Sequence, residues 1–238
     1  MKSLISKALT GLLVIFTLFT YGQDAKVDKI LARHFKATGQ EKLVKTESIK
    51  MQGNSQMQGN VFPFTMYIKR PNMIRNEVIV QGQEMVQAYD GENGWIIAPW
   101  MGSGVQDLTG FQLKSMKENS NMDGELYQWE EKGHELNYLG EEDLDGKPVY
   151  NLQLVKKNGD TIHFFIDGEQ YFILKQILKT TVNNQNLALD TYLNNYKMID
   201  GIAFPTSIEN HMPGNVNQIT IDSIQVNLTL NNDLFHKP

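Results

Sequence analysis

Short turn signals recur along most of this chain, and their spacing constrains the fold more than any other feature. Asx-Gly pairs supply the positive φ angles that tight hairpins need, so such a pair predicts the end of one strand and the start of the next. The signals are Gly59-Asn60, Arg70-Pro71-Asn72, Gly82, Asp90-Gly91, Asp145-Gly146, Asn158-Gly159, Asp167-Gly168, Asn183-Asn184, Asp200-Gly201 and Pro213-Gly214. Strands joined by turns this short lie antiparallel to their neighbours and form a meander.

The segments between these signals are predicted to be strands. Their expected ranges are 47–58, 61–70, 73–81, 84–90, 94–100, 134–142, 147–157, 160–167, 171–183, 187–199, 202–211 and 215–228. A meander of this size bends into a barrel or splits into a sandwich. The fold class is therefore mainly β, with a few helices.

Two segments outside the strands predict helices. In 24–38 the apolar side chains recur at steps of three and four, Gly39 is a suitable C-terminal stop, and 41–46 adds a further turn. The stripe on 24–38 consists of Val27, Ile30, Leu31, His34 and Phe35. A helix with one apolar face needs a surface to lie on, and the sheet supplies it.

The stretch from Gly102 to Gly133 interrupts the strand pattern because it has few β-branched residues. We expect loop and helix here, with helices at 107–119 and 125–132. A long non-sheet insertion in a β meander is typical of a lid or a binding loop. A plain cap over the sheet edge is the alternative.

The first 22 residues have the order of a secretory signal, namely a basic start at Lys2 and Lys7, an apolar run and then small residues. We expect cleavage near Gly22–Gln23, with an uncleaved anchor as the alternative, and a single domain over 23–238. The chain has no cysteine. It therefore lacks the residue that would carry the acyl chains of a lipoprotein, so we expect a soluble exported protein in the periplasm.

Charge and side-chain inventory exclude several functions. The formal net charge is -5, which is unsuited to nucleic acid because that affinity rests on cations. Without cysteine there are no thiolate metal sites. The five histidines show no metal-binding spacing, and no Gly-x-Ser-x-Gly elbow or phosphate loop occurs. We expect no catalytic residues, no metal and no cofactor; acidic pairs such as Glu130-Glu131 leave an envelope hydrolase as a remote alternative.

The predicted strand 61–70 has one face that is large, soft and apolar. Side chains alternate across a strand, so Phe62, Phe64, Met66, Ile68 and Arg70 share a face. Methionine adapts to varied apolar shapes, and the chain contains 11 of them. Such a face suits a cavity for acyl chains; ordinary core packing is the alternative.

Three groups of residues resemble one known family. The first is Tyr67-Ile68-Lys69-Arg70-Pro71-Asn72 followed by Asp90-Gly91, Trp95 and Pro99; the second is Tyr192, Leu193, Tyr196, Asp200-Gly201, Phe204-Pro205 and Ile208; the third is Thr38-Gly39-Gln40-Glu41-Lys42-Leu43. Their order resembles the LolA-like periplasmic lipoprotein carriers, in particular the longer branch of outer membrane lipoprotein-sorting proteins.

This resemblance implies an unclosed antiparallel β-barrel of about 11–12 strands, wrapped around helices that act as a lid. It also implies a cargo of acylated lipoprotein or other lipid, received from an inner-membrane transporter and passed to an outer-membrane acceptor. We expect a monomer. An envelope-stress sensor or adaptor that binds lipid or protein without transport is the alternative.

The resemblance also implies that Arg70 is a latch that bonds to the lid and holds it shut when empty. An arginine at a strand end can instead reach water by snorkelling. The polar insertion 102–133 departs from the shorter members of the family, so their lid residues cannot be transferred by position. The predicted cavity residues are Phe62, Phe64, Met66, Ile68, Met85, Trp95 and Ile97.

Overall fold

The computed structural model describes residues 25–102, 104–182 and 184–238, so the predicted leader at 1–22 lies outside the described residues. One antiparallel sheet contains thirteen strands. They are β1 (Ser48–Met57), β2 (Asn60–Lys69), β3 (Met73–Val80), β4 (Gln83–Tyr89), β5 (Gly94–Ile97), β6 (Gln106–Asp107), β7 (Glu135–Leu144), β8 (Lys147–Val155), β9 (Thr161–Asp167), β10 (Ile173–Val182), β11 (Gln185–Ile199), β12 (Ile202–Met212) and β13 (Asn215–Val226).

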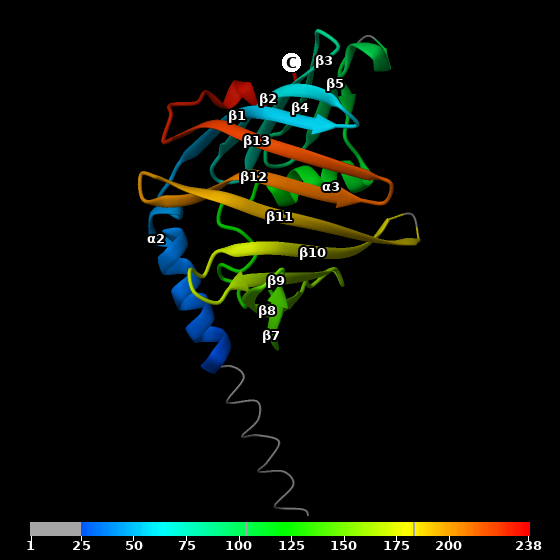
Figure 1. The fold of residues 1–238 in the computed structure, drawn as a ribbon. Helices are drawn as coiled ribbons and strands as arrows, with labels where there is room; N and C mark the ends of the chain where they lie inside the picture. The colour runs from blue at the N-terminus through cyan, green and yellow to red at the C-terminus, as the bar shows by residue number, and fades with distance from the viewer. Residues whose placement is uncertain (1–24, 103, 183) are drawn as a thin grey trace, which may run out of the picture.

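The sheet consists of two meanders joined through the first and last strands. Its order is β6-β5-β4-β3-β2-β1-β13-β12-β11-β10-β9-β8-β7. Because β6 and β7 stand at the two edges, the sheet curves without closing (Figure 1). The mainly β, unclosed antiparallel barrel is confirmed, and all twelve predicted strands are present.

The helices lie on the concave side and at one end of the sheet. Residues 25–38 form the N-terminal helix, and α2 (Gln40–Leu43) follows it. The inserted α3 (Gly110–Asn119) packs against β3 and β4. Two short 3-10 helices complete the set, η1 (Pro99–Met101) and η2 (Asn232–Leu234). No helix of the described residues is long and apolar enough to cross a bilayer.

Two predictions inside the insertion and its flank need correction, and one short strand was not predicted. The expected helix at 125–132 is a series of turns, because Gly124, Gln128 and Gly133 adopt positive φ angles that interrupt helical hydrogen bonding. The end of the predicted strand 94–100 is η1, where Pro99 occupies the first helical positions. The two-residue strand β6 was not expected, since nothing in so short a segment marks it.

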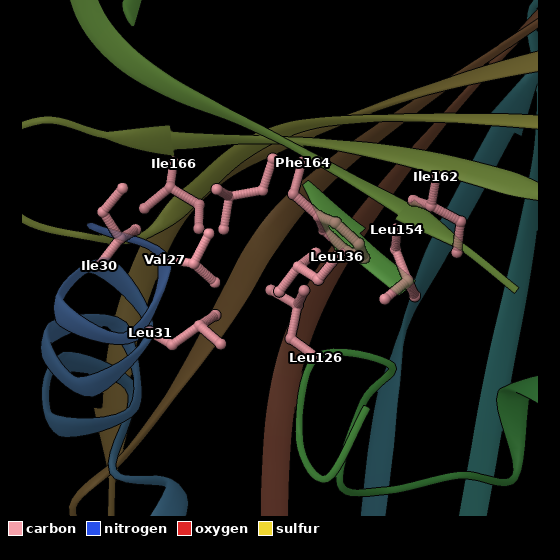
Figure 2. Packing of buried hydrophobic residues seen from close by; sticks show 10 residues of the cluster. Val27, Ile30, Leu31, Leu126, Leu136, Leu154, Ile162, Phe164 and Ile166 are labelled. Carbon is pink, nitrogen blue, oxygen red and sulfur yellow. The ribbon is translucent and has the colours of Figure 1, made fainter. Parts of the chain in front are cut away.

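The N-terminal helix anchors the largest apolar cluster. Val27, Ile30 and Leu31 are each no more than 5% exposed and pack towards β7, β8 and β9 (Figure 2). Figure 2 also shows Leu126 of the insertion against the same cluster. One end of the barrel is therefore filled by this helix and is solid core.

His34 is part of this helix and is buried. Its Nδ1 donates to the carbonyl oxygen of Tyr171 at 2.8 Å. Burial lowers the pKa of His34 from its usual value, against the opposing effect of that hydrogen bond. The neutral form is the one that fits the folded protein.

We expect His34 to make the protein less stable in acid. The unfolded residue has a pKa of about 6.5, so the stability that neutral His34 contributes is complete above that pH. It is lost as the pH falls towards the lowered pKa of the folded state, at about 1.4 kcal/mol for each pH unit between the two pKa values. Thermal unfolding between pH 7.5 and 5.5 should therefore show a shallower decline in the His34→Gln variant. Burial also lowers the pKa of His163, which both proteins retain. Equal slopes for the two proteins would contradict this prediction.

The last residues cover part of the convex face. Phe235 is fully buried, and its carbonyl oxygen accepts a hydrogen bond from Trp95 Nε1 at 2.8 Å. Arg75 donates to the carbonyl oxygen of Leu234 at 3.0 Å and stacks over the Trp95 ring. The convex side of β3–β5 is therefore also core.

Candidate functional site

An apolar hollow lies on the concave face where the two meanders meet. Its volume is about 630 Å³, which is within the range of small-ligand pockets. Its lining residues are Met51, Ser55, Met57, Phe62, Phe64, Met66, Asn76, Val78, Val80, Gln87, Pro205, Ile208, Ile219 and Ile221. All but Ser55, Asn76 and Gln87 carry apolar side chains, so the hollow offers few hydrogen-bonding partners.

The strand register explains why these side chains point inward. Phe64 of β2 is paired with Val78 of β3 on one side and with Gly53 of β1 on the other. Partners directly opposite each other share a face, so Phe64 and Val78 both face the hollow. Gly53 stands at a bulge where β13 comes close, and a Cβ there would lie 2.0 Å from the carbonyl oxygen of Thr220. Glycine is therefore required for β1 and β13 to pair.

Most of the predicted cavity residues share this concave face. Phe62, Phe64 and Met66 line the hollow. Ile68 lies deeper and is 8% exposed. It belongs to a buried cluster that α3 covers through Met116, and Met85 packs against this cluster. The predicted apolar face of 61–70 therefore continues from the hollow into the core beneath the insertion.

Trp95 and Ile97 do not belong to this group, and their predicted placement in the cavity is corrected. They are paired with Ala88 and Val86 and lie on the convex face, where the C-terminal residues bury Trp95. Ile96 faces the concave side instead. The segment Gly94–Ile97 is apolar on both faces, so the alternation of side chains could not show which face was inward.

The sequence reasoning missed the wall contributed by β1, β12 and β13. Met51 and Met57 lie on β1, while Ile208, Ile219 and Ile221 come from the end of the chain. Alternation shows which residues of one strand share a face, but nothing local indicates that β1 pairs with β13. That pairing places the two walls side by side.

Arg70 connects the end of β2 to the helices and to the insertion. Its guanidinium donates to the carbonyl oxygens of Thr46 at 2.7 Å and Leu43 at 2.9 Å. It also binds both carboxylate oxygens of Asp123, at 2.5 and 2.9 Å. The Asp123 carboxylate is the main cause that raises the pKa of Arg70, against the lowering effect of burial. Arg70 therefore contacts the insertion through the carboxylate of Asp123, and contacts the end of α2 and the segment after it through two carbonyl oxygens.

A second set of charges holds the insertion to the β8–β9 turn, on the other side of the barrel from Arg70. Lys156 donates to Glu118 of α3 at 2.7 Å and to Glu125 at 3.1 Å. Burial lowers the pKa of Lys156, but the two carboxylates outweigh it and the pKa is raised overall. Lys114 of α3 likewise pairs with Asp160 at 2.5 Å. The insertion is therefore tied by charge to both sides of the barrel, and we call residues 108–134 the lid.

A polar hollow of about 770 Å³ lies beside the lid, between Lys114 and the turns of β8–β9 and β10–β11. Its central groups already satisfy one another, because Asp160 accepts hydrogen bonds from Lys114, Thr180 and Asn158. Burial raises the pKa of Asp160, but these donors outweigh it and hold the pKa below its usual value. The apolar hollow is therefore the better candidate for a ligand site.

Metal binding has no site in the described part of the chain. Within residues 25–238, apart from 103 and 183, no three His, Asp or Glu side chains are grouped so that they could hold an ion. His163 lies on β9, and its Nδ1 is 3.3 Å from the amide oxygen of Asn151. The apolar hollow is therefore suited to an apolar ligand and not to a metal ion.

An unclosed antiparallel barrel with helices on its concave side is the class of fold, and comparison with solved structures identifies which one. No protein-family profile and no curated protein matches the sequence. A DUF1329 family protein from Desulfovibrio piger superposes with a TM-score of 0.60 at 15% identity, over 87% of this chain and 97% of that one.

Two further structures name the fold. A LolA superfamily protein from Nitrosomonas europaea has a TM-score of 0.57 at 13% identity, over 81% of this chain and 90% of that one. A putative outer membrane lipoprotein-sorting protein domain from Vibrio parahaemolyticus has 0.57 at 14% identity, over 83% and 94%. This chain has the fold of the LolA superfamily, and the predicted resemblance is confirmed at that level.

Proposed function

We propose that this protein is a carrier that holds the acyl chains of lipoproteins or of other lipids in the apolar hollow. The observation that carries the proposal is the lining of the hollow, in which eleven of fourteen residues are apolar. Each buried CH₂ group contributes roughly 0.8 kcal/mol. A chain of ordinary lipid length thus supplies enough free energy for binding without any specific polar contact.

A carrier must also release its cargo, and the lid supplies a means. The contacts of Arg70, Lys156 and Lys114 with the lid favour the closed, empty state. The loss of these contacts when the lid opens offsets part of the free energy gained by burying the acyl chain. The affinity of the carrier for its cargo is therefore lower than that of an acceptor with a deeper cavity. Transfer then needs neither nucleotide nor metal on this component, and no catalytic step.

The proposal places the protein in the periplasm as a monomer. The predicted leader at 1–22 and the lipoprotein-sorting fold of its structural neighbour support this location. An inner-membrane transporter and an outer-membrane acceptor would be its partners, with the acylated lipoprotein or lipid as cargo.

Lipid analysis of the purified protein tests the proposal. The chain, expressed with its own leader and isolated from the periplasm, should carry acylated peptides or lipids in near-stoichiometric amount by mass spectrometry. After delipidation it should bind a fluorescent acyl probe in solution. A protein that is lipid-free and also fails to bind the probe would contradict a carrier, and a sensor or adaptor with a protein partner would then be the better interpretation.

A further inference from the structure

The two rims of the barrel differ in charge. At one rim every hairpin turn carries a charged residue, namely Arg70, Asp90, Asp145, Glu169 and Asp200. At the other rim the β1–β2, β3–β4, β10–β11 and β12–β13 turns and the β5–β6 loop carry none; their residues include Gln58-Gly59, Gln81-Gly82, Asn184, Pro213-Gly214 and Pro99–Met101. The remaining turn at this end, β8–β9, is charged, with Lys156, Lys157 and Asp160. We call the rest of this end, formed by the four uncharged turns and the β5–β6 loop, the uncharged rim; in Figure 1 it lies on the right, opposite α2.

Exposed apolar side chains gather at the uncharged rim. Among the described residues nine large apolar side chains are exposed, and six of them lie at this end of the strands. These six are Val61, Ile79, Trp100, Met101, Met212 and Val216. Trp100 is 50% and Met101 49% exposed, and they form the tip of η1. Water is a poor environment for such a concentration of apolar surface.

The apolar hollow opens towards the same rim. Met57 is the last residue of β1 and Val80 the last of β3, and both line the hollow. Phe62, two residues into β2 from the adjoining turn, lines it too. The exposed tip at Trp100 and Met101 and the mouth of the hollow therefore lie at the same end of the strands.

Charged groups border the uncharged rim. Glu84 is the second residue of β4 and Lys179 lies near the end of β10, while Lys156, Lys157 and Asp160 stand beside the rim in the β8–β9 turn. An uncharged apolar edge bordered by charges matches the electrostatic profile of a bilayer, in which hydrocarbon is bounded by headgroups. Tryptophan is also the side chain enriched at that boundary.

We propose that the uncharged rim docks on the surface of a lipid bilayer, with Trp100 and Met101 inserted into the headgroup boundary. Docking in this way holds the mouth of the hollow against the membrane, so an acyl chain can move between the two without crossing water. This inference rests on the proposed carrier function for its purpose, but the docking itself is measured separately.

Vesicle flotation tests the docking directly. The wild-type protein should float with phosphatidylcholine vesicles, and its fluorescence should shift to the blue, because Trp100 is 50% exposed whereas Trp95 is 2% exposed and Trp129 is partly buried. The double variant Trp100→Ser/Met101→Ser should bind the vesicles at least about tenfold more weakly, because it loses the burial of two large side chains.

A matched control removes equal apolar exposure elsewhere. Leu139 and Met198 are 50% and 56% exposed and lie outside the uncharged rim, so Leu139→Ser/Met198→Ser should float like the wild type. Three results would each overturn the proposal. They are an equal loss of vesicle binding in both double variants, no vesicle binding by the wild type, and binding only to anionic vesicles that is abolished by salt.

Uptake of the acyl probe from solution separates this proposal from the carrier function. Both double variants should take up the probe as the wild type does, while only the rim variant should lose transfer of the probe from vesicles. If the wild type binds the probe but no vesicles, docking is wrong and the carrier function stands. If it floats but never binds the probe, docking stands and the carrier function fails.

Discussion

Val78→Asp is expected to weaken binding of an acyl probe by at least about a hundredfold, which corresponds to about 3 kcal/mol. Val78 lies in the middle of the hollow wall, paired with Phe64 on β2 and with Met85 on β4. A carboxylate at this position must either remain charged against the acyl chain or take up a proton. Both outcomes cost free energy that the apolar wall does not cost.

The fold should survive this substitution, because Val78 is only partly buried and the empty hollow admits water to the carboxylate. Ile79→Asp is the matched control. It introduces the same group one residue along the same strand, on the opposite face, where Ile79 is 39% exposed. Probe titration in solution should show wild-type affinity for Ile79→Asp.

Two results would count against the hollow as the binding site. If Val78→Asp and Ile79→Asp bind the probe equally well, the acyl chain lies elsewhere. If both lose binding together, the effect comes from the added charge on the strand. Circular dichroism of the two variants should match, which removes unfolding as an explanation.

The local parts of the fold could be predicted because their causes are local. A turn such as Asp145-Gly146 needs positive φ angles that its own residues supply, and both residues adopt them. The apolar stripe of Val27, Ile30 and Leu31 likewise predicted the face that the helix buries. These signals require no knowledge of distant residues.

The contacts between distant parts of the chain could not be predicted in the same way. The pairing of β1 with β13 joins residues more than 150 positions apart, including Met51 with Ile224. The burial of Trp95 depends on Phe235, at the far end of the chain. Both follow from the competition among all strands and segments for partners, which no single segment records.

The lid shows the same division between local and distant causes. Arg70 was predicted to bond to the lid; in the structure its carbonyl partners, Leu43 and Thr46, lie at and just after the end of α2, and its partner in the insertion is Asp123. Asp123 was not foreseen, because it lies in the connection between the two helices predicted at 107–119 and 125–132, where no local pattern fixes the conformation. The turn at 121–124 holds Asp123 in the segment that faces the guanidinium.

The loss of the Arg70 contacts should both destabilise the protein and favour cargo binding. In Arg70→Leu, Asp123 loses its partner while remaining mostly buried, and two carbonyl oxygens lose their donor. Removing one partner of a buried pair costs roughly 3–5 kcal/mol; with about a fifth of each side chain exposed, we expect about 2–3 kcal/mol. For a chain of this size the melting temperature should fall by roughly 5–10 °C.

The effect on cargo has the opposite sign. If acyl chains enter only when the lid opens, destabilising the closed state raises the fraction of protein that can bind. The affinity of Arg70→Leu for the acyl probe should therefore rise, by roughly tenfold for a shift of about 1.4 kcal/mol in the lid equilibrium. Protein purified from the periplasm should also retain more lipid than the wild type.

Arg75→Leu is the control that separates the latch from simple loss of stability. Arg75 is as buried as Arg70 and also binds a carboxylate and a carbonyl oxygen, those of Glu77 and Leu234, but it does so on the convex face. It should melt earlier without gaining probe affinity. Equal affinity in the two variants would assign Arg70 a structural role only. A gain confined to Arg70→Leu would establish that the charge at the end of β2 controls entry to the hollow.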